Sequence, residues 1–153
     1  MAKPTKRILI AIAAGLLVFA VGAVAVLVGA AIYGHKRAVI AGNQEAATMN
    51  LKTISRAQIQ YSTEYGGFGT FDQLVETRLL SQRFAGPKPI VDGYAYDLKV
   101  RPASAGQQST FTLNGDPESP DMGTKHFFTD DSSPTIRVNL NRPASASDPP
   151  HLR

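Results

Sequence analysis

The sequence predicts an α+β protein in which a long N-terminal transmembrane helix continues beyond the membrane and packs on a small antiparallel β-sheet head. Three observations support this fold class. Residues 8–33 form an uncharged apolar run, residues 34–65 continue with an amphipathic helical pattern, and short segments of alternating apolar and polar residues follow residue 93. Spacings of three, four and seven residues place side chains on one helical face, whereas alternate residues share one face of a strand.

The apolar run at residues 8–33 predicts a membrane span. At about 1.5 Å per residue it would extend about 39 Å, which is longer than the hydrocarbon core of a bilayer, about 30 Å. A cleavable signal peptide is the alternative, but its apolar core covers only about 7–15 residues. We therefore expect an uncleaved, single-pass anchor.

Basic residues on both sides of this run predict its orientation. Lys3, Lys6 and Arg7 precede the run, and Lys36 and Arg37 follow it. The small excess at the front favours a cytoplasmic N-terminus, formed by residues 1–7. The head is then periplasmic or extracellular, and the span lies in a bacterial inner membrane.

Residues 34–65 contain no proline and predict an amphipathic continuation of the same helix. One row of its apolar face recurs every seven residues and a second row is offset by four. The rows consist of Ile40, Ala47, Ile54 and Tyr61, with Leu51, Gln58 and Tyr65. We call these residues the helix stripe and expect them to pack on the head, Tyr61 and Tyr65 included. Gly66 and Gly67 then supply a helix stop.

Residues 66–140 predict the head. Thr70 followed by Gln73 matches a capping box and indicates a short connecting helix after it. Segments 94–100, 110–114, 125–130 and 135–140 have the pattern of strands, with Phe127 or Phe128 facing inward. Short strands and short turns favour an antiparallel meander. The tail, residues 141–153, has three prolines and little to bury, so we expect it to be disordered.

Composition argues against several classes of function. The net charge is +4, but from residue 38 onward 11 lysines and arginines stand against 12 acidic residues. A nucleic-acid-binding head would need a basic surface, so neither nucleic acid nor a small-molecule substrate is an expected partner. The chain has no cysteine, which excludes disulfides and cysteine-based metal or nucleophile chemistry.

No residue pattern indicates an enzyme, a cofactor site or a metal site. A catalytic trio of Ser132, His126 and Asp130 is conceivable, but turn chemistry explains these residues more simply. The remaining histidines, His35 and His151, stand far apart in the sequence. An acidic loop offers oxygen ligands for calcium without the spacing of a known calcium loop, and we interpret it as a solvated loop. Its residues are Asp116, Glu118 and Asp121, with Asp130 and Asp131 as further candidates.

The central segment resembles the type IV pilin and pseudopilin superfamily. The stretch NQEAATMNLKTISRAQIQYSTEYGGFGTFDQLVE and the later GYAY and HFFTDDSSPTIRVN match the order of residues in bacterial pilin-like proteins, over residues 43–139. The matching positions are Ala47, Leu51, Lys52, Thr53, Ile54, Ala57, Gln58, Tyr61, Tyr65, Gly66, Phe68, Thr70, Phe71, Gln73, Leu74, Gly93, Tyr94, Phe127, Phe128, Asp130, Ser132, Ile136 and Arg137. The resemblance implies a long helix on a small sheet and a role in assembly.

The N-terminus departs from this family. Members processed by the prepilin peptidase carry a basic leader, a glycine at the cleavage point and a glutamate at the fifth mature position. Here Gly15 is followed by Leu16, and no acidic residue precedes Glu45. A glutamate buried in a membrane is costly unless it is paired. In this family the glutamate is thought to pair with the N-terminus of a neighbouring subunit, so its loss removes one means of aligning subunits.

Two hypotheses for function follow. The first is a structural subunit of a pilus or a type II secretion-type assembly, which contacts the membrane and further copies or other pilin-like subunits. The second is a non-polymerising, membrane-tethered binding module that presents loops 102–109 and 115–125. Glycines every seven residues in the span permit close helix–helix approach. The expected assembly and packing residues are Gly15, Gly22, Gly29, Ile40, Ala47, Leu51, Ile54, Tyr61 and Tyr65.

Overall fold

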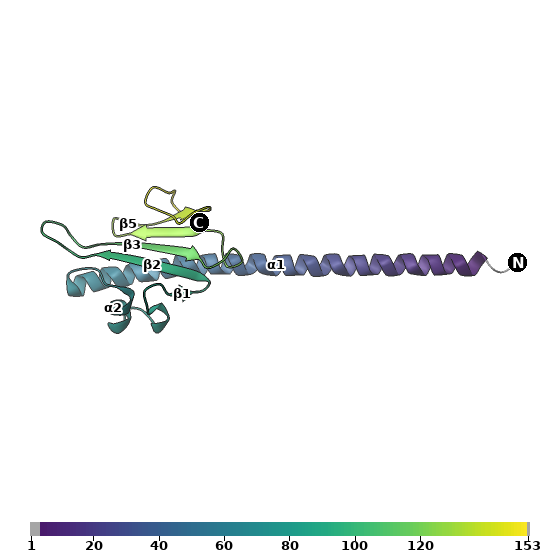
Figure 1. Cartoon of the computed structure of the whole chain (residues 1–153), viewed down its shortest axis with the longest axis horizontal. Helices are drawn as coiled ribbons and strands as arrows, with labels where there is room; N and C mark the ends of the chain where they lie inside the picture. The colour runs from purple at the N-terminus through teal and green to yellow at the C-terminus, as the bar shows by residue number, and fades with distance from the viewer. Residues whose placement is uncertain (1–3, 153) are drawn as a thin grey trace. The chain divides into compact units, whose positions relative to one another are not determined.

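The computed structural model describes the backbone of residues 4–152 and the side chains of residues 26–30 and 33–152. It divides into two compact units, Met1–Ala38 and Val39–Arg153. The elements follow one another as α1 (Pro4–Tyr65), α2 (Phe71–Glu76), the 3-10 turn η1 (Gln82–Phe84), β1 (Ile90–Val91), β2 (Tyr94–Arg101), β3 (Thr110–Pro117), β4 (His126–Asp130) and β5 (Ser133–Asn139) (Figure 1). The α+β class is therefore confirmed.

Helix α1 contains the predicted membrane span. Most of that span, residues 8–25 and 31–32, lies outside the residues whose side chains are described. Within the described part of the chain, no helix combines the length and the apolar character required to cross a membrane.

The five strands form one antiparallel sheet in the order β1-β2-β3-β4-β5, which confirms the predicted meander. The register places Leu98 opposite Leu113 and Gly115 opposite Phe127. β1 and β2 are joined through Asp92 and Gly93, whose φ angles are 53° and 76°. A two-residue Asp-Gly turn with positive φ at both positions matches the right-handed twist of a hairpin.

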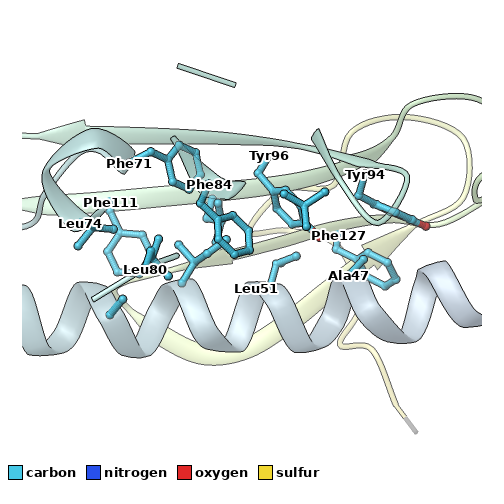
Figure 2. Close-up of a cluster of buried hydrophobic side chains, with 14 of the residues drawn as sticks. Ala47, Leu51, Phe71, Leu74, Leu80, Phe84, Tyr94, Tyr96, Phe111 and Phe127 are labelled. Carbon is cyan, nitrogen blue, oxygen red and sulfur yellow. The ribbon is translucent and has the colours of Figure 1, made fainter. Parts of the chain in front are cut away.

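Within the second unit, residues 39–65 of α1 pack on one face of this sheet. Ala47, Leu51 and Ile54 are fully buried. The side chains of Ala47 and Leu51 point toward the sheet in Figure 2. Further core residues come from α2, the turn after it and the strands. They are Phe71, Leu74, Leu80, Phe84, Val91, Tyr94, Tyr96, Phe111, Leu113, Phe127 and Ile136. The helix stripe and the inner strand faces therefore bury one another's apolar surface.

The predicted helix stop at Gly66 and the predicted capping box of Thr70 and Gln73 are both confirmed. Gly66 has a φ of 77° and its N–H bonds to the carbonyl of Ser62, which ends α1. Thr70 caps α2: its hydroxyl accepts from the N–H of Gln73 and the Gln73 side chain accepts from the N–H of Thr70, at 3.3 Å and 2.8 Å. These reciprocal bonds satisfy donors that a helix start otherwise leaves free.

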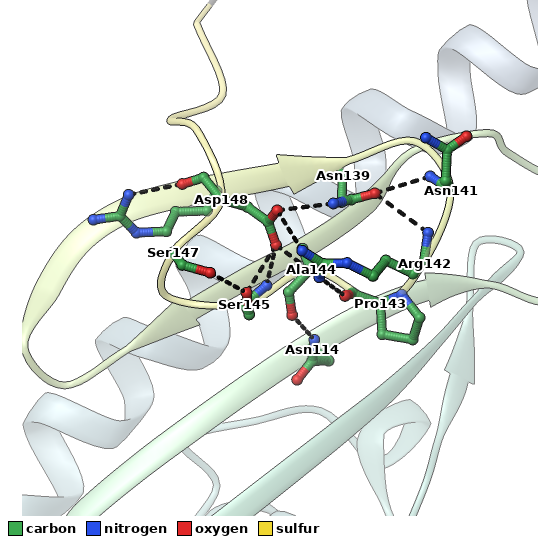
Figure 3. A network of polar contacts seen from close by, with 10 residues as sticks. Asn114, Asn139, Asn141, Arg142, Pro143, Ala144, Ser145, Ser147 and Asp148 are labelled. Carbon is green, nitrogen blue, oxygen red and sulfur yellow. Dashed lines mark hydrogen bonds and ion pairs between the residues drawn. The ribbon is translucent and has the colours of Figure 1, made fainter.

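The C-terminal tail corrects an expectation, because residues 141–152 fold back on the sheet instead of remaining disordered. Ala144 and Asp148 are buried, and Asn114 of β3 donates to the carbonyl of Ala144 at 2.7 Å (Figure 3). Residues 149–151 then lie along the free edge of β5, where Val138 donates to Pro149 and His151 donates to Ile136. Polar contacts and edge pairing hold this segment, and neither produces an apolar pattern in the sequence.

Candidate functional site

The central residues of the helix stripe form a structural contact. Leu51 meets the sheet at Gly115, where an added Cβ would lie 2.8 Å from Leu51 Cδ1 and 3.3 Å from Tyr96 Cε1. Glycine is needed here because the helix side chain approaches the strand backbone so closely. Since Ala47, Leu51 and Ile54 are 0% exposed, they stabilise the head and are not available to a partner of the folded chain.

The ends of the stripe are more open. Ile40 and Tyr61 are half-buried, and Tyr65 is 58% exposed, so the expectation that Tyr65 packs on the head is corrected. Tyr61 lies over Gly69, where an added Cβ would be 3.0 Å from its ring. Tyr65 stacks on Tyr61, with ring centroids 4.4 Å apart. Tyr65 thus contacts the ring of Tyr61 and keeps most of its own surface exposed.

The predicted small-residue face of the span is described at one position. Gly15 and Gly22 lie outside the residues whose side chains are described. At Gly29, apart from its chain neighbours and the nearby backbone of the same helix, no atom of the described residues lies within 4 Å of the place where a Cβ would stand. Gly29 therefore has free space next to it, as a helix–helix contact would require.

A polar cluster that the sequence analysis missed joins α1 to the β1–β2 turn. Asn50 is buried and donates to Asp92 Oδ2 at 3.0 Å and to the Tyr96 hydroxyl oxygen at 3.1 Å. Arg83 donates to Asn50 Oδ1 at 3.0 Å and pairs with Asp92 at 3.3 Å. Burial raises the pKa of Tyr96 to about 12. An Asp-Gly pair is a local sequence signal for a hairpin turn. The contact of Asp92 with Asn50, 42 positions away on the helix, has no such signal.

Gln58 is a second buried polar residue of the helix stripe. It is 0% exposed and bonds both backbone groups of Gly69: its Nε2 donates to the carbonyl at 2.6 Å, and its Oε1 accepts from the N–H at 2.9 Å. A buried amide needs such partners because desolvation without them is costly. Gln58 therefore fixes the loop between α1 and α2.

The two loops that the second hypothesis assigned to a ligand differ from each other. In the loop at 115–125, the carbonyl of Met122 accepts from Asn43 at 3.0 Å and Thr124 Oγ1 accepts from Gln44 at 3.1 Å. The Tyr94 hydroxyl donates to the carbonyl of Lys125, and burial raises the pKa of Tyr94 well above its ordinary value. The loop at 102–109 has a small bridge of Ser104 with Gln107 and is largely exposed.

The geometry separates the residues considered for catalysis. His126 Nδ1 lies 2.7 Å from Asp116 Oδ1, while the Ser132 hydroxyl donates to Asp130 Oδ1 at 2.6 Å. The trio of Ser132, His126 and Asp130 is therefore not assembled as a relay. Among the described residues, no group of three histidine, aspartate or glutamate side chains is placed to hold a metal ion. This includes the acidic loop considered for calcium.

We compared the chain with protein-family models, with curated proteins and with solved structures, and none of them matches it.

Proposed function

We propose that this chain is a pilin-like, single-pass membrane protein that acts structurally, as a subunit of a pilus or of a type II secretion-type assembly. In this proposal the N-terminus is cytoplasmic, residues 8–33 cross a bacterial inner membrane, and the head is periplasmic or extracellular. The role is non-enzymatic and uses no cofactor.

One observation carries the proposal: residues 39–65 of α1 share a single core with an antiparallel meander. Leu51 and Ile54 are fully buried against the sheet, so neither the helix nor the sheet covers its apolar side alone. A head of this kind needs a helix as one of its layers. The same helix, α1, begins at Pro4 and carries the uncharged run of residues 8–33. An apolar run attached to a small polar head is what an anchored assembly subunit requires.

The proposed partners are the membrane and other copies or pilin-like subunits. Glycines at positions 15, 22 and 29 recur on one helical face, and small residues allow helices in a membrane to approach closely. At Gly29 the described residues leave this face open. Contacts through such a face would not need the acidic residue that aligns subunits in the resembling family.

The second candidate is a membrane-tethered module that does not polymerise. The absence of any acidic residue before Glu45 favours it, because the usual electrostatic pairing between subunits is then missing. The exposed loop at 102–109 would be its contact surface.

The experiment that separates the two candidates is expression of the full chain in its host. We would determine the mature N-terminus by mass spectrometry and examine sheared cell-surface material for filaments containing the chain. Filaments with a start at Leu16 would support the assembly subunit. An intact Met1 with all of the protein in the membrane fraction would reject it in favour of the tethered module, and protein found only in the soluble fraction would reject both.

A matched pair of variants tests the helix–helix contact. Gly29→Leu would place a bulky side chain on the small-residue face, whereas Gly34→Leu adds the same side chain off that face. Both glycines have open space around them. We expect Gly29→Leu to reduce filament yield and Gly34→Leu to leave it unchanged, and equal yields would contradict the proposed face.

A further inference from the structure

A groove runs between α1 and the β4–β5 hairpin, on the flank of the helix beside the buried stripe. Its volume is about 250 Å³. The helix contributes Lys52, Ser55, Arg56 and Ile59, and the hairpin contributes Thr129, Pro134 and Ile136. All of these residues belong to the second compact unit, so the groove is formed within the head.

The groove has an apolar wall that lacks a cover. Ile59 is 61% exposed although it stands beside the buried face of the helix. Pro134 is exposed as well, and Ile136 forms the buried floor at 8% exposure. An exposed isoleucine next to a proline and a second isoleucine gives an aliphatic side chain a surface to pack on.

A buried hydroxyl in the groove has no partner. Among the described side chains, Ser55 Oγ is the buried polar atom that makes no hydrogen bond. Buried polar groups in native proteins are nearly always bonded, so an exception calls for an explanation. Because the oxygen is itself covered, this hydroxyl belongs to the wall of the groove and does not face a ligand within it.

Two cations also lie uncompensated on this groove. Lys52 and Arg56 are four residues apart on the helix, where like charges repel each other. Neither forms an ion pair or a hydrogen bond with any residue that the structure describes. Arg83 and Arg142, by contrast, each pair with an aspartate.

We propose that this groove binds an acidic, partly apolar peptide segment of a partner protein. A carboxylate of the segment lies between Lys52 and Arg56, and an aliphatic side chain packs on Ile59 and Pro134. A wholly apolar ligand would bury the two cations without partners, which is unfavourable. A basic ligand would be repelled.

The segment comes from a different protein because the head's own carboxylates are largely occupied. Eight of the twelve acidic residues accept a hydrogen bond or pair with a cation within the chain, which leaves few carboxylates for a second copy to offer. They are Asp72, Asp92, Asp97, Asp116, Asp130, Asp131, Asp148 and Glu64. This binding does not depend on the proposed assembly, since peptide can bind whether or not filaments form.

The test is an NMR titration of the full-length, ¹⁵N-labelled protein with the peptide acetyl-Gly-Leu-Glu-Leu-Glu-Gly-amide, beside a peptide with glutamine at both glutamate positions. We expect shift changes to concentrate at residues 52–59 and 129–136 with the acidic peptide only. Because two exposed ion pairs are worth about a tenfold change in Kd, Lys52→Gln with Arg56→Gln should weaken binding by about that factor. The control, Lys88→Gln with Arg101→Gln, removes the same charge at exposed positions outside the groove and should bind normally.

Ser55→Ala is a second control. Since the buried hydroxyl makes no hydrogen bond and does not reach the peptide, we expect its removal to leave the thermal midpoint unchanged or raised and the Kd of the peptide unchanged. Three results would overturn the proposal: no localised shifts up to about 5 mM peptide, equal binding of the glutamine peptide, or groove shifts that follow protein concentration without peptide. The last result would instead assign the groove to a second copy of the chain.

Discussion

The two faces of the sheet are covered by different kinds of interaction. Toward α1, the contact consists of apolar side chains such as Leu51, Tyr96 and Phe127, all fully buried (Figure 2). On the opposite face, residues 141–148 are held by polar groups around Asp148 (Figure 3). Apolar burial is non-directional and depends on area, whereas a polar cluster depends on the position of every partner.

The polar side can be described atom by atom. Asp148 accepts from Asn139 Nδ2 and from the N–H of Ser145, both at 2.8 Å, and from the Arg142 guanidinium at 3.0 Å and 3.1 Å. Arg137 donates to the backbone carbonyl of Asp148 at 2.8 Å. One carboxylate thus connects β5 to the tail. We therefore expect the apolar face and the polar face of the sheet to be destabilised by different perturbations.

The largest effect should come from a charge on the apolar side. Ile54→Asp places a carboxylate where the side chain is 0% exposed, and a buried unpaired charge costs several kcal/mol of folding free energy. We expect the full-length variant to lose its cooperative thermal transition or to show a strongly lowered midpoint by circular dichroism. Met49→Asp, at a position 57% exposed on the same helix, is the control and should stay near the parent. Similar midpoints for the two variants would contradict the packing.

A smaller loss should follow the removal of a polar group from the same side. Gln58→Leu keeps the size of the side chain but leaves the N–H and the carbonyl of Gly69 without partners. Each buried unsatisfied group costs about 1–3 kcal/mol. Urea unfolding should therefore show a reduced free energy of unfolding, while Gln60→Leu, which removes an exposed contact with Glu64, should show little change. A free energy equal to the parent's would mean that the Gly69 contact contributes nothing.

Alkaline titration tests the burial of the two tyrosines of β2, Tyr94 and Tyr96. Desolvation is the main cause that raises the pKa of Tyr96 to about 12 and that of Tyr94 higher still. A raised pKa in the folded state means that stability is present below the ordinary tyrosine pKa, about 10, and is lost as pH rises toward the folded value. Tyrosinate absorbance should show these two side chains protonated at pH 11. Tyr94→Phe and Tyr96→Phe identify their contributions, and ionisation of either near pH 10 in the folded protein would contradict its burial.

The mildest effect should be release of the tail by acid. Hydrogen bonds from Asn139 and Ser145, with Arg142 beside them, lower the pKa of Asp148 to about 2. A lowered folded pKa gives stability that is present above the ordinary value, about 3.9, and is lost as pH falls toward 2. We expect the His151 N–H, which donates to Ile136, to lose its protection against hydrogen exchange, relative to the intrinsic rate at each pH, as the pH falls from 5 to 2.

Two controls locate that effect in the tail. The N–H groups of Leu113 and Thr129, in the centre of the sheet, should keep their protection over the upper part of this range. Asp148→Asn should show little protection of the His151 N–H at every pH, without the transition. A transition that persists in this variant would assign it to another group.

Much of the apolar side was predictable from the sequence. The period of seven identified Ala47 and Ile54, the period of two identified β2 and β3, and the capping box identified the start of α2. These signals are visible because one continuous apolar surface imposes a regular spacing on each element. Phe127 or Phe128 was expected inward, and the structure buries both, because the tail crosses the outer face that Phe128 shares with Asn114 and Arg137.

The groove and the polar clusters were not predictable in the same way. Ser55, Lys52 and Arg56 have the pattern of an ordinary solvated helix flank, and only the nearby β4–β5 hairpin turns that flank into a groove. Asn50, Arg83 and Asp92 are similarly spread over three elements before the fold brings them together. Such contacts are specified by pairs of residues distant in sequence, and a single chain carries no local signal for them.

The sequence by itself determined the elements of this head and which side of each would be buried, because helix and strand periodicity follow directly from backbone geometry. Only the tertiary structure decided that the tail covers the outer face, that Tyr65 remains outside the core, and that a basic groove stands open beside the helix. Those outcomes depend on hydrogen bonds and charges whose partners meet only after the chain has folded.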